Sequence, residues 1–178
     1  MNKPKLIILY GFAASGKTTL AKMYIADNPL ALNIEGDQII SMIGDWRSHE
    51  TEARAIVFEY TQKLAEEHLK KGFDVIVPYL LTNTEDAELF REIALRKEAD
   101  LFEIYINLNH TEAIDRLLKR GVWGEEGSEQ LSEADLPEIE ELYVKMESSM
   151  SSLTKVKFLS ILQNDTEGTY DEFLKLLY

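Results

Sequence analysis

The chain has 178 residues, 45% of them hydrophobic and 29% charged, which is typical of one globular domain with a buried core. Its 19 Lys and Arg residues are outnumbered by 32 Asp and Glu, and the net charge of −13 argues against non-specific nucleic-acid binding. Because the sequence has no cysteine, it excludes disulfides, thiolate metal ligands and cysteine nucleophiles. No apolar run approaches the roughly 18 residues of a membrane span, so we expect a cytoplasmic protein with no membrane partner.

Short apolar segments alternate with helical patterns in the first half of the chain. The run Leu6–Tyr10 predicts a buried strand, and a Gly-rich turn then leads into a helix over residues 17–27. A second strand is expected over Ala31–Ile34 and a third over Val75–Val77. Between these two strands, apolar residues at helical spacing and a terminal glycine predict a long helix over Thr51–Lys71.

The alternation continues beyond the third strand. Asn83 or Thr84 is expected to cap a helix that ends near Glu98, and a fourth strand follows over Leu101–Ile106. An Asn-x-x-Glu pattern that resembles a capping box then starts a helix over Asn109–Arg120. Each of these strands is again preceded and followed by a helical segment.

Residues 121–136 break this pattern. The stretch holds three of the nine glycines and a cluster of acidic residues, so we interpret it as a mobile lid. A helix is expected over Pro137–Met150 and a fifth strand over Val156–Leu162. Thr169 and Glu172 form a capping-box pattern for the last helix.

Five apolar strands joined by helices predict an α/β fold. Their runs are continuously apolar rather than alternating, which is typical of a parallel sheet that is covered on both faces. We find no internal repeat and no low-complexity linker, so residues 1–178 are expected to form one domain.

The most specific motif is Gly-Phe-Ala-Ala-Ser-Gly-Lys-Thr at residues 11–18, a complete match to GxxxxGK[ST]. Its glycines let successive backbone N–H groups turn toward phosphates, while Lys17 reaches the β- and γ-phosphates and the Thr18 hydroxyl binds Mg²⁺. The motif follows a predicted strand and precedes a helix, as phosphate binding at a helix N-terminus requires. The nucleotide-binding residues expected from it are Gly11, Ala13, Ala14, Ser15, Gly16, Lys17, Thr18 and Thr19.

Switch GTPases, mechanical ATPases and small kinases all carry this motif. A GTPase is disfavoured because the DxxG match, Asp165–Gly168, follows the fifth predicted strand and has no NKxD partner. A mechanical ATPase usually has an acidic residue at the end of its third strand, where this chain has Val77, Pro78 and Tyr79. The pattern therefore favours a kinase.

Three further charged residues are candidates for catalysis in a kinase. Asp37 directly follows the second strand, at the sheet edge where ligands bind, and can accept the proton of an acceptor hydroxyl. Its alternative role is to cap the next helix. Arg116 and Arg120 share one helix face before the lid and can neutralise charge on the transferring phosphoryl group. The alternative for these arginines is surface pairing with Glu112 or Asp115.

With these residues, the sequence resembles small P-loop kinases such as chloramphenicol phosphotransferase, gluconate kinase and the zeta-toxin-like sugar-nucleotide kinases. The resemblance implies a P-loop NTPase three-layer sandwich whose five-stranded parallel sheet has the order 2-3-1-4-5. It also implies that Asp37 is the acceptor's base and that Arg116, Arg120 and the residues after them correspond to an Arg-bearing helix and lid. Two departures stand out, because many relatives have Arg at the position of Ile40 and Asp at the position of Pro78.

We therefore expect an ATP- and Mg²⁺-dependent kinase that phosphorylates a hydroxyl of a small-molecule acceptor, as a monomer or homodimer and without nucleic acid. A toxin-like or antibiotic-resistance phosphotransferase and a non-catalytic nucleotide-binding regulator are the alternatives. Arg47 and Arg54 are candidates to replace the missing arginine, and Trp46 and Trp123 are candidates to stack on a ring-bearing substrate.

Overall fold

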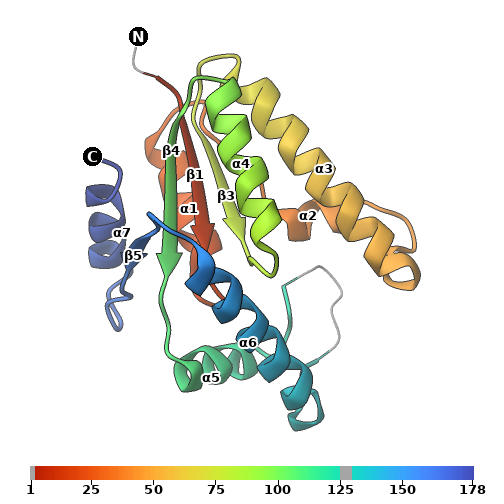
Figure 1. Ribbon diagram of the computed structural model, residues 1–178. Coiled ribbons are helices and arrows are strands. Elements are labelled where there is room, and N and C mark those ends of the chain that lie inside the picture. Colours follow the sequence, from red (N-terminus) through yellow and green to blue (C-terminus); the bar gives the residue numbers. More distant parts are fainter. Residues whose placement is uncertain (1–2, 125–129) are drawn as a thin grey trace.

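Five strands form a parallel sheet that lies between two layers of helices (Figure 1). The computed structural model describes residues 3–124 and 130–178. The strands are β1 (Lys5–Tyr10), β2 (Leu32–Asn33), β3 (Val75–Tyr79), β4 (Asp100–Ile106) and β5 (Lys157–Leu159). Their order β2-β3-β1-β4-β5, with neighbouring strands parallel, confirms the predicted fold class and strand order.

Helices connect the strands and cover the sheet. The α-helices are α1 (Lys17–Asp27), α2 (Gly36–Ser41), α3 (Glu50–Leu69), α4 (Thr84–Arg96), α5 (His110–Arg120), α6 (Leu136–Ser152) and α7 (Thr166–Lys175), and two 3₁₀ helices are η1 (Trp46–His49) and η2 (Glu133–Asp135). Figure 1 shows α1 and α7 on one face and α3 and α4 on the other, with α5 and α6 near the carboxyl ends of the strands. Within the two described ranges, no helix is both long and apolar enough to cross a membrane.

The central strand β1 shows why the sequence carries a continuous apolar run. Successive side chains of a strand point to opposite faces, so Leu6, Ile8 and Tyr10 pack in the core beneath α3 and α4. Ile7 and Leu9 pack in the core beneath α1 and α7. All five side chains are 0% exposed, so the strand is buried on both faces after its first residue, Lys5.

Both edge strands are shorter than expected. β2 covers residues 32–33 rather than 31–34, and β5 covers 157–159 rather than 156–162. Each pairs with a single neighbour, β3 or β4, so a ladder of hydrogen bonds holds only one side of its backbone. The central strand pairs on both sides and keeps its full predicted length.

The start of α7 corrects one prediction. The helix begins at Thr166, and the Asp165 side chain caps it by accepting a 2.8 Å hydrogen bond from the Gly168 backbone N–H. The capping box expected between Thr169 and Glu172 is therefore wrong. Asp is a stronger N-cap than Thr, and Asp165 caps the helix four residues before Thr169. The same Asp165–Gly168 stretch that matched DxxG thus has a structural role.

Candidate active site

The phosphate-binding motif folds into a tight loop between β1 and α1, which two glycines make possible. Gly11 has φ +156°, and a Cβ added there would lie 2.8 Å from the Ser15 hydroxyl oxygen and 3.3 Å from the Ile106 carbonyl oxygen. Gly16, the residue before α1, has φ +95°, in the left-handed region that favours glycine. The first backbone N–H groups of α1 have no partner within the helix, which makes this end of the helix suited to an anion.

The loop forms one wall of a large cavity. Residues 13–19 all line it, so seven of the eight expected nucleotide-binding residues face one space, whereas Gly11 shapes the turn beneath it. The Ser15 side chain is 1% exposed, and its hydroxyl has no hydrogen-bond partner among the described residues. A buried polar group without a partner costs stability, so the loop is better satisfied with an additional hydrogen-bonding group inside it.

Lys17 reaches back over this loop. Its ammonium group donates hydrogen bonds to the Gly11 carbonyl at 2.8 Å and to the Phe12 carbonyl at 2.6 Å. Desolvation by the surrounding protein lowers the pKa of Lys17 to about 7, with the negative charge of Asp37 acting in the opposite direction and the positive charge of Arg120 adding to the decrease. The ammonium is thus poorly solvated and gains from any anion that joins it.

This pKa predicts that nucleotide binding takes up a proton. At pH 8 a Lys17 with a pKa of about 7 is mostly neutral, whereas contact with phosphates favours the charged form, so binding should take up most of a proton. Affinity should correspondingly fall as the pH rises above about 7. Titration calorimetry in buffers of different ionisation enthalpy measures the uptake. Lys17→Arg, whose guanidinium stays charged, is the control and should take up none through this residue.

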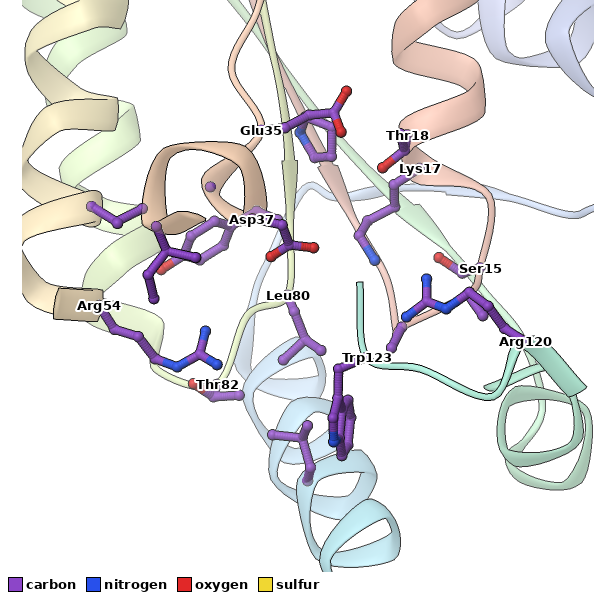
Figure 2. A pocket seen from close by; sticks show the side chains of 18 of the residues that line it. Ser15, Lys17, Thr18, Glu35, Asp37, Arg54, Leu80, Thr82, Arg120 and Trp123 are labelled. Carbon is purple, nitrogen blue, oxygen red and sulfur yellow. The ribbon is translucent and has the colours of Figure 1, made fainter. Parts of the chain in front are cut away.

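Asp37 lies in the first turn of α2, and Figure 2 shows its carboxylate facing Lys17 across the cavity. The N-cap of α2 is Glu35, so the alternative expectation that Asp37 caps the helix is wrong. The reason is local, since Glu35 has extended dihedral angles and the helix already begins at Gly36. The Asp37 side chain is therefore placed within the first turn, at the carboxyl edge of the sheet.

Arg120, the last residue of α5, points into the same space from another wall (Figure 2). Its Nε donates a 2.8 Å hydrogen bond to the Val122 carbonyl. Gly124 lies between Arg120 and Asp37, because a Cβ added there would be 2.8 Å from Asp37 Oδ2 and 3.5 Å from Arg120 Nη2. The chain after α5 therefore passes directly over the two charged side chains.

Arg116 lines the cavity one helical turn before Arg120. Its Nη2 donates to Glu112 Oε1 at 2.8 Å, and 30% of its side chain is exposed. The structure thus shows the pairing with Glu112 that the sequence offered as the alternative role, together with a position at the cavity wall. A phosphate group that binds Arg116 must therefore share the guanidinium group with the Glu112 carboxylate.

Within the predicted lid, residues 121–136, a hydrogen bond joins residues 121 and 131. The Leu131 backbone N–H donates a 2.7 Å hydrogen bond to the Gly121 carbonyl, which closes the neck of a loop. Trp123 is half-buried, packs against the core on the α3 and α4 side, and lines the cavity. Residues 125–129 of the predicted lid lie outside the described residues.

The cavity has a volume of about 1450 Å³. Sites for one small molecule usually measure roughly 300–1,000 Å³, so this one has room for two reactants. Its basic lining residues are Lys17, Arg47, Arg54, Arg116, Lys119 and Arg120. Its acidic lining residues are Glu35, Asp37, Glu50, Asp86, Asp135 and Glu138. Among described residues the lining therefore carries six charges of each sign in a chain of net charge −13, which makes the cavity the more favourable place for an anion.

The far side of the cavity is formed by η1 and the start of α3. Trp46, Arg47 and Arg54 line it, as the sequence proposed for acceptor-side residues. The Arg47 guanidinium lies 4.5 Å from the Trp46 ring centroid, and Arg54 Nε donates to Glu50 Oε1 at 2.8 Å. Ile40, where many relatives have Arg, is 2% exposed and packs in a small apolar cluster, so this position does not offer a charge.

Sequence reasoning did not single out several other residues of the wall, among them Glu35, Tyr79, Asp86 and Lys119. The Tyr79 hydroxyl donates to Asp86 Oδ2 at 2.7 Å, and burial raises the pKa of Asp86. A signal existed for Glu35 and Tyr79, because each lies at the end of a strand where parallel sheets bind ligands. For Asp86 the sequence indicated only a position in the first turn of a helix, because its contact with Tyr79 depends on tertiary packing.

A sequence model of the AAA domain family matches residues 6–143, a range that contains the loop, Asp37 and both arginines of α5. The chain belongs to this family. No curated protein matches this AAA domain in sequence.

Solved structures define the fold of this AAA domain more closely. A sugar kinase from Janibacter is 15% identical with a TM-score of 0.64, over 98% of this chain and 94% of that one. The APS kinase of Mycobacterium tuberculosis, solved with AMPPNP and APS, is 16% identical with a TM-score of 0.58, over 99% of each chain. A chain of the Pnkp1/Rnl/Hen1 RNA repair complex is 18% identical with a TM-score of 0.67, over 86% of this chain but 47% of that one, so the AAA domain spans about half its length. The fold is thus that of small P-loop kinases, as the resemblance predicted.

Proposed function

We propose that this AAA domain is an ATP- and Mg²⁺-dependent kinase that transfers the γ-phosphoryl group to a hydroxyl of a small molecule. The observation that carries the proposal is the convergence of Lys17, Asp37 and Arg120, from three different elements, on one cavity (Figure 2). The volume beyond them leaves room for an acceptor. The kinases among the similar structures support the proposal, and one of them was solved with a nucleotide analogue.

The loop fits the phosphates of a nucleoside triphosphate. A phosphate oxygen would supply the partner that the buried Ser15 hydroxyl lacks, and the turn at Gly11 leaves no space for a side chain that would fill the cradle. Thr18, in the first turn of α1, lines the same cavity and would hold Mg²⁺ through its hydroxyl. Bound there, the ion would neutralise charge on the β- and γ-phosphate oxygens.

Asp37 is placed to activate the acceptor. Its carboxylate accepts the proton of the acceptor hydroxyl as that oxygen bonds to the γ-phosphorus. The bond between the γ-phosphorus and the bridging oxygen breaks, and ADP leaves with the bonding electrons. Lys17 and Arg120, which face Asp37 in the cavity, stabilise the negative charge on the phosphoryl oxygens during the transfer.

The acceptor side of the cavity favours a small polar molecule. Its walls combine the rings of Trp46 and Tyr79 with charged groups of both signs, Arg54 and Asp86. A mixture of apolar surface and a few polar groups is typical of small-molecule sites. A polynucleotide acceptor is the rival, since one similar structure belongs to an RNA repair complex, but the net charge of −13 weighs against it.

An acceptor screen with ATP and Mg²⁺ tests the function, with ADP release as the readout. The panel contains sugars, sugar nucleotides, nucleosides, hydroxyl-bearing antibiotics and an oligonucleotide with a 5′-hydroxyl end. We expect at least one small molecule to stimulate ADP release and to appear in phosphorylated form by mass spectrometry. If only the oligonucleotide stimulates ADP release, and the stimulation falls steeply as the salt concentration rises, the acceptor is a polynucleotide and not a small molecule. Nucleotide binding without turnover on any acceptor would favour the regulator.

Arg120→Lys is expected to reduce turnover more than Arg116→Lys. Arg120 faces Asp37 and Lys17, whereas Arg116 is paired with Glu112. A catalytic arginine contributes about three to five decades in rate, and lysine keeps the charge but loses the planar fork, so we expect Arg120→Lys to lose at least about two decades in kcat. Steady-state kinetics at saturating ATP measure both variants. Wild-type turnover in both variants would show that neither arginine contributes to catalysis.

A further inference from the structure

The end of β3 carries no carboxylate, but the neighbouring strand supplies one at the same level of the sheet. In β3 the position is Pro78. Asn33 of β2 is paired with Ile76 of β3, and the Ile34 backbone N–H donates to the Ile76 carbonyl at 3.0 Å. Continuing this parallel register places Glu35 beside Pro78. The missing acidic group is therefore present one strand further from the centre.

Glu35 belongs to the nucleotide side of the cavity. Its half-buried side chain lines the cavity together with Thr18, and the helix that begins with the phosphate loop, α1, packs against β2. Figure 2 shows the Glu35 carboxylate and the Thr18 hydroxyl on the same side of Lys17, away from Arg54 and Thr82. This arrangement places Glu35 on the wall of the cavity that also carries the residue expected to bind the metal.

The Glu35 side chain is not used to hold the fold together. Although Glu35 is the N-cap residue of α2, its side chain makes no capping hydrogen bond. The Asn33 side-chain amide donates to Glu35 Oε1 at 2.5 Å, which orients the carboxylate and leaves Oε2 without a hydrogen bond among the described residues. A carboxylate that is oriented by one oxygen and open at the other is suited to a cation.

We propose that Glu35 is the acidic residue of the Mg²⁺ site and takes the place of the carboxylate missing from β3, with Asn33 as its positioning residue. The proposal rests on the proposed function, because it requires a bound nucleotide. Mg²⁺ in nucleotide sites is held by one or two carboxylates together with substrate phosphates. Glu35 and Thr18 supply such a set from adjacent elements. The two acids of the β2–α2 turn then have separate tasks, Glu35 toward the metal and Asp37 toward the acceptor.

The test compares AMPPNP affinity with Mg²⁺ and with EDTA, by titration calorimetry, in the wild type and in Glu35→Gln. We expect the wild type to bind the Mg²⁺ complex at least about tenfold more tightly than the metal-free analogue. Glu35→Gln should lower this ratio by about tenfold or more, a loss in the range seen when groups that orient or complete metal sites are removed. Its affinity for metal-free AMPPNP should stay equal or increase, because a negative charge near the phosphates is gone. Structural damage would weaken both affinities.

Two further variants test whether the effect is specific to a carboxylate at this edge of the sheet. Glu138→Gln removes the same charge from the α6 wall of the cavity and should keep the wild-type ratio. Adding Pro78→Asp to Glu35→Gln returns a carboxylate to β3 and should raise the ratio again. An unchanged ratio in Glu35→Gln, or an equal loss in Glu138→Gln, overturns the assignment and leaves the kinase proposal standing. Failure of the wild type to bind AMPPNP under either condition overturns both.

Discussion

Lys17→Ala is expected to abolish measurable phosphoryl transfer while the protein stays folded. The ammonium group contacts the carbonyls of Gly11 and Phe12 within the phosphate loop, so its removal takes charge from the phosphates and little from the core. Thermal melting provides the binding readout, since a ligand present at about 100 times its Kd stabilises a protein by about 2.7 kcal/mol. The wild type should show such a shift with ATP–Mg²⁺, and the variant a much smaller one.

Lys119→Ala is the matched control for this experiment. Lys119 also lines the cavity, but it lies on α5 and outside the loop, so its removal should leave most of the nucleotide shift in place. Equal nucleotide-induced shifts in the wild type and in Lys17→Ala would contradict the phosphate-binding role of the loop. A variant that melts early without nucleotide would instead point to a structural role for Lys17.

Asp37→Asn is expected to reduce transfer by about two to four decades, the contribution of a general base. Asn cannot accept the proton, yet it has nearly the same shape as Asp. Stability should change little, because the N-cap of α2 is Glu35 and a charge in the first turn of a helix contributes only about 0.3–1 kcal/mol. The measurements are kcat at saturating ATP and the melting temperature. A large drop in melting temperature with normal turnover would contradict the role as base.

The nucleotide affinity of Asp37→Asn must be compared with that of the wild type at a chosen pH. The charge of Asp37 raises the pKa of Lys17, so removing it leaves Lys17 less protonated at neutral pH. Affinity compared at a pH low enough for Lys17 to be charged in both proteins should be nearly equal. A tenfold weaker affinity at that pH would show that Asp37 acts on the nucleotide and not on the acceptor.

The helices illustrate what the sequence could and could not predict. Helical spacing correctly predicted α3, because apolar residues recur along two of its faces. Ala53 and Val57 are buried, whereas Ile56, Tyr60 and Leu64 are 39%, 49% and 47% exposed. Periodicity alone does not tell which face meets the sheet, since that depends on the elements that pack against the helix.

The residues of the candidate site also fall into two groups, those that the sequence predicts and those that depend on tertiary packing. Lys17 was predictable because its motif is local, and Asp37 because the end of a parallel strand has a known place at the sheet edge. The approach of Tyr79 to Asp86 was not predictable, because it joins β3 to α4 through tertiary packing. The sequence shows that Glu35 follows the second predicted strand. Its position beside Pro78 could not be predicted, because it depends on the register of β2 against β3.

The hydrogen bond between Leu131 and Gly121 has a consequence for how this protein can diversify. It joins residues 121 and 131 of the connection between α5 and α6, so the two ends of the segment between them are held together. Doubling the length of a flexible loop costs only about 0.6 kcal/mol. Insertions and exchanges within this segment are therefore expected to alter the part of the cavity that Trp123 lines. For the proposed kinase, we expect acceptor preference to change through this segment without changes in the phosphate-binding loop.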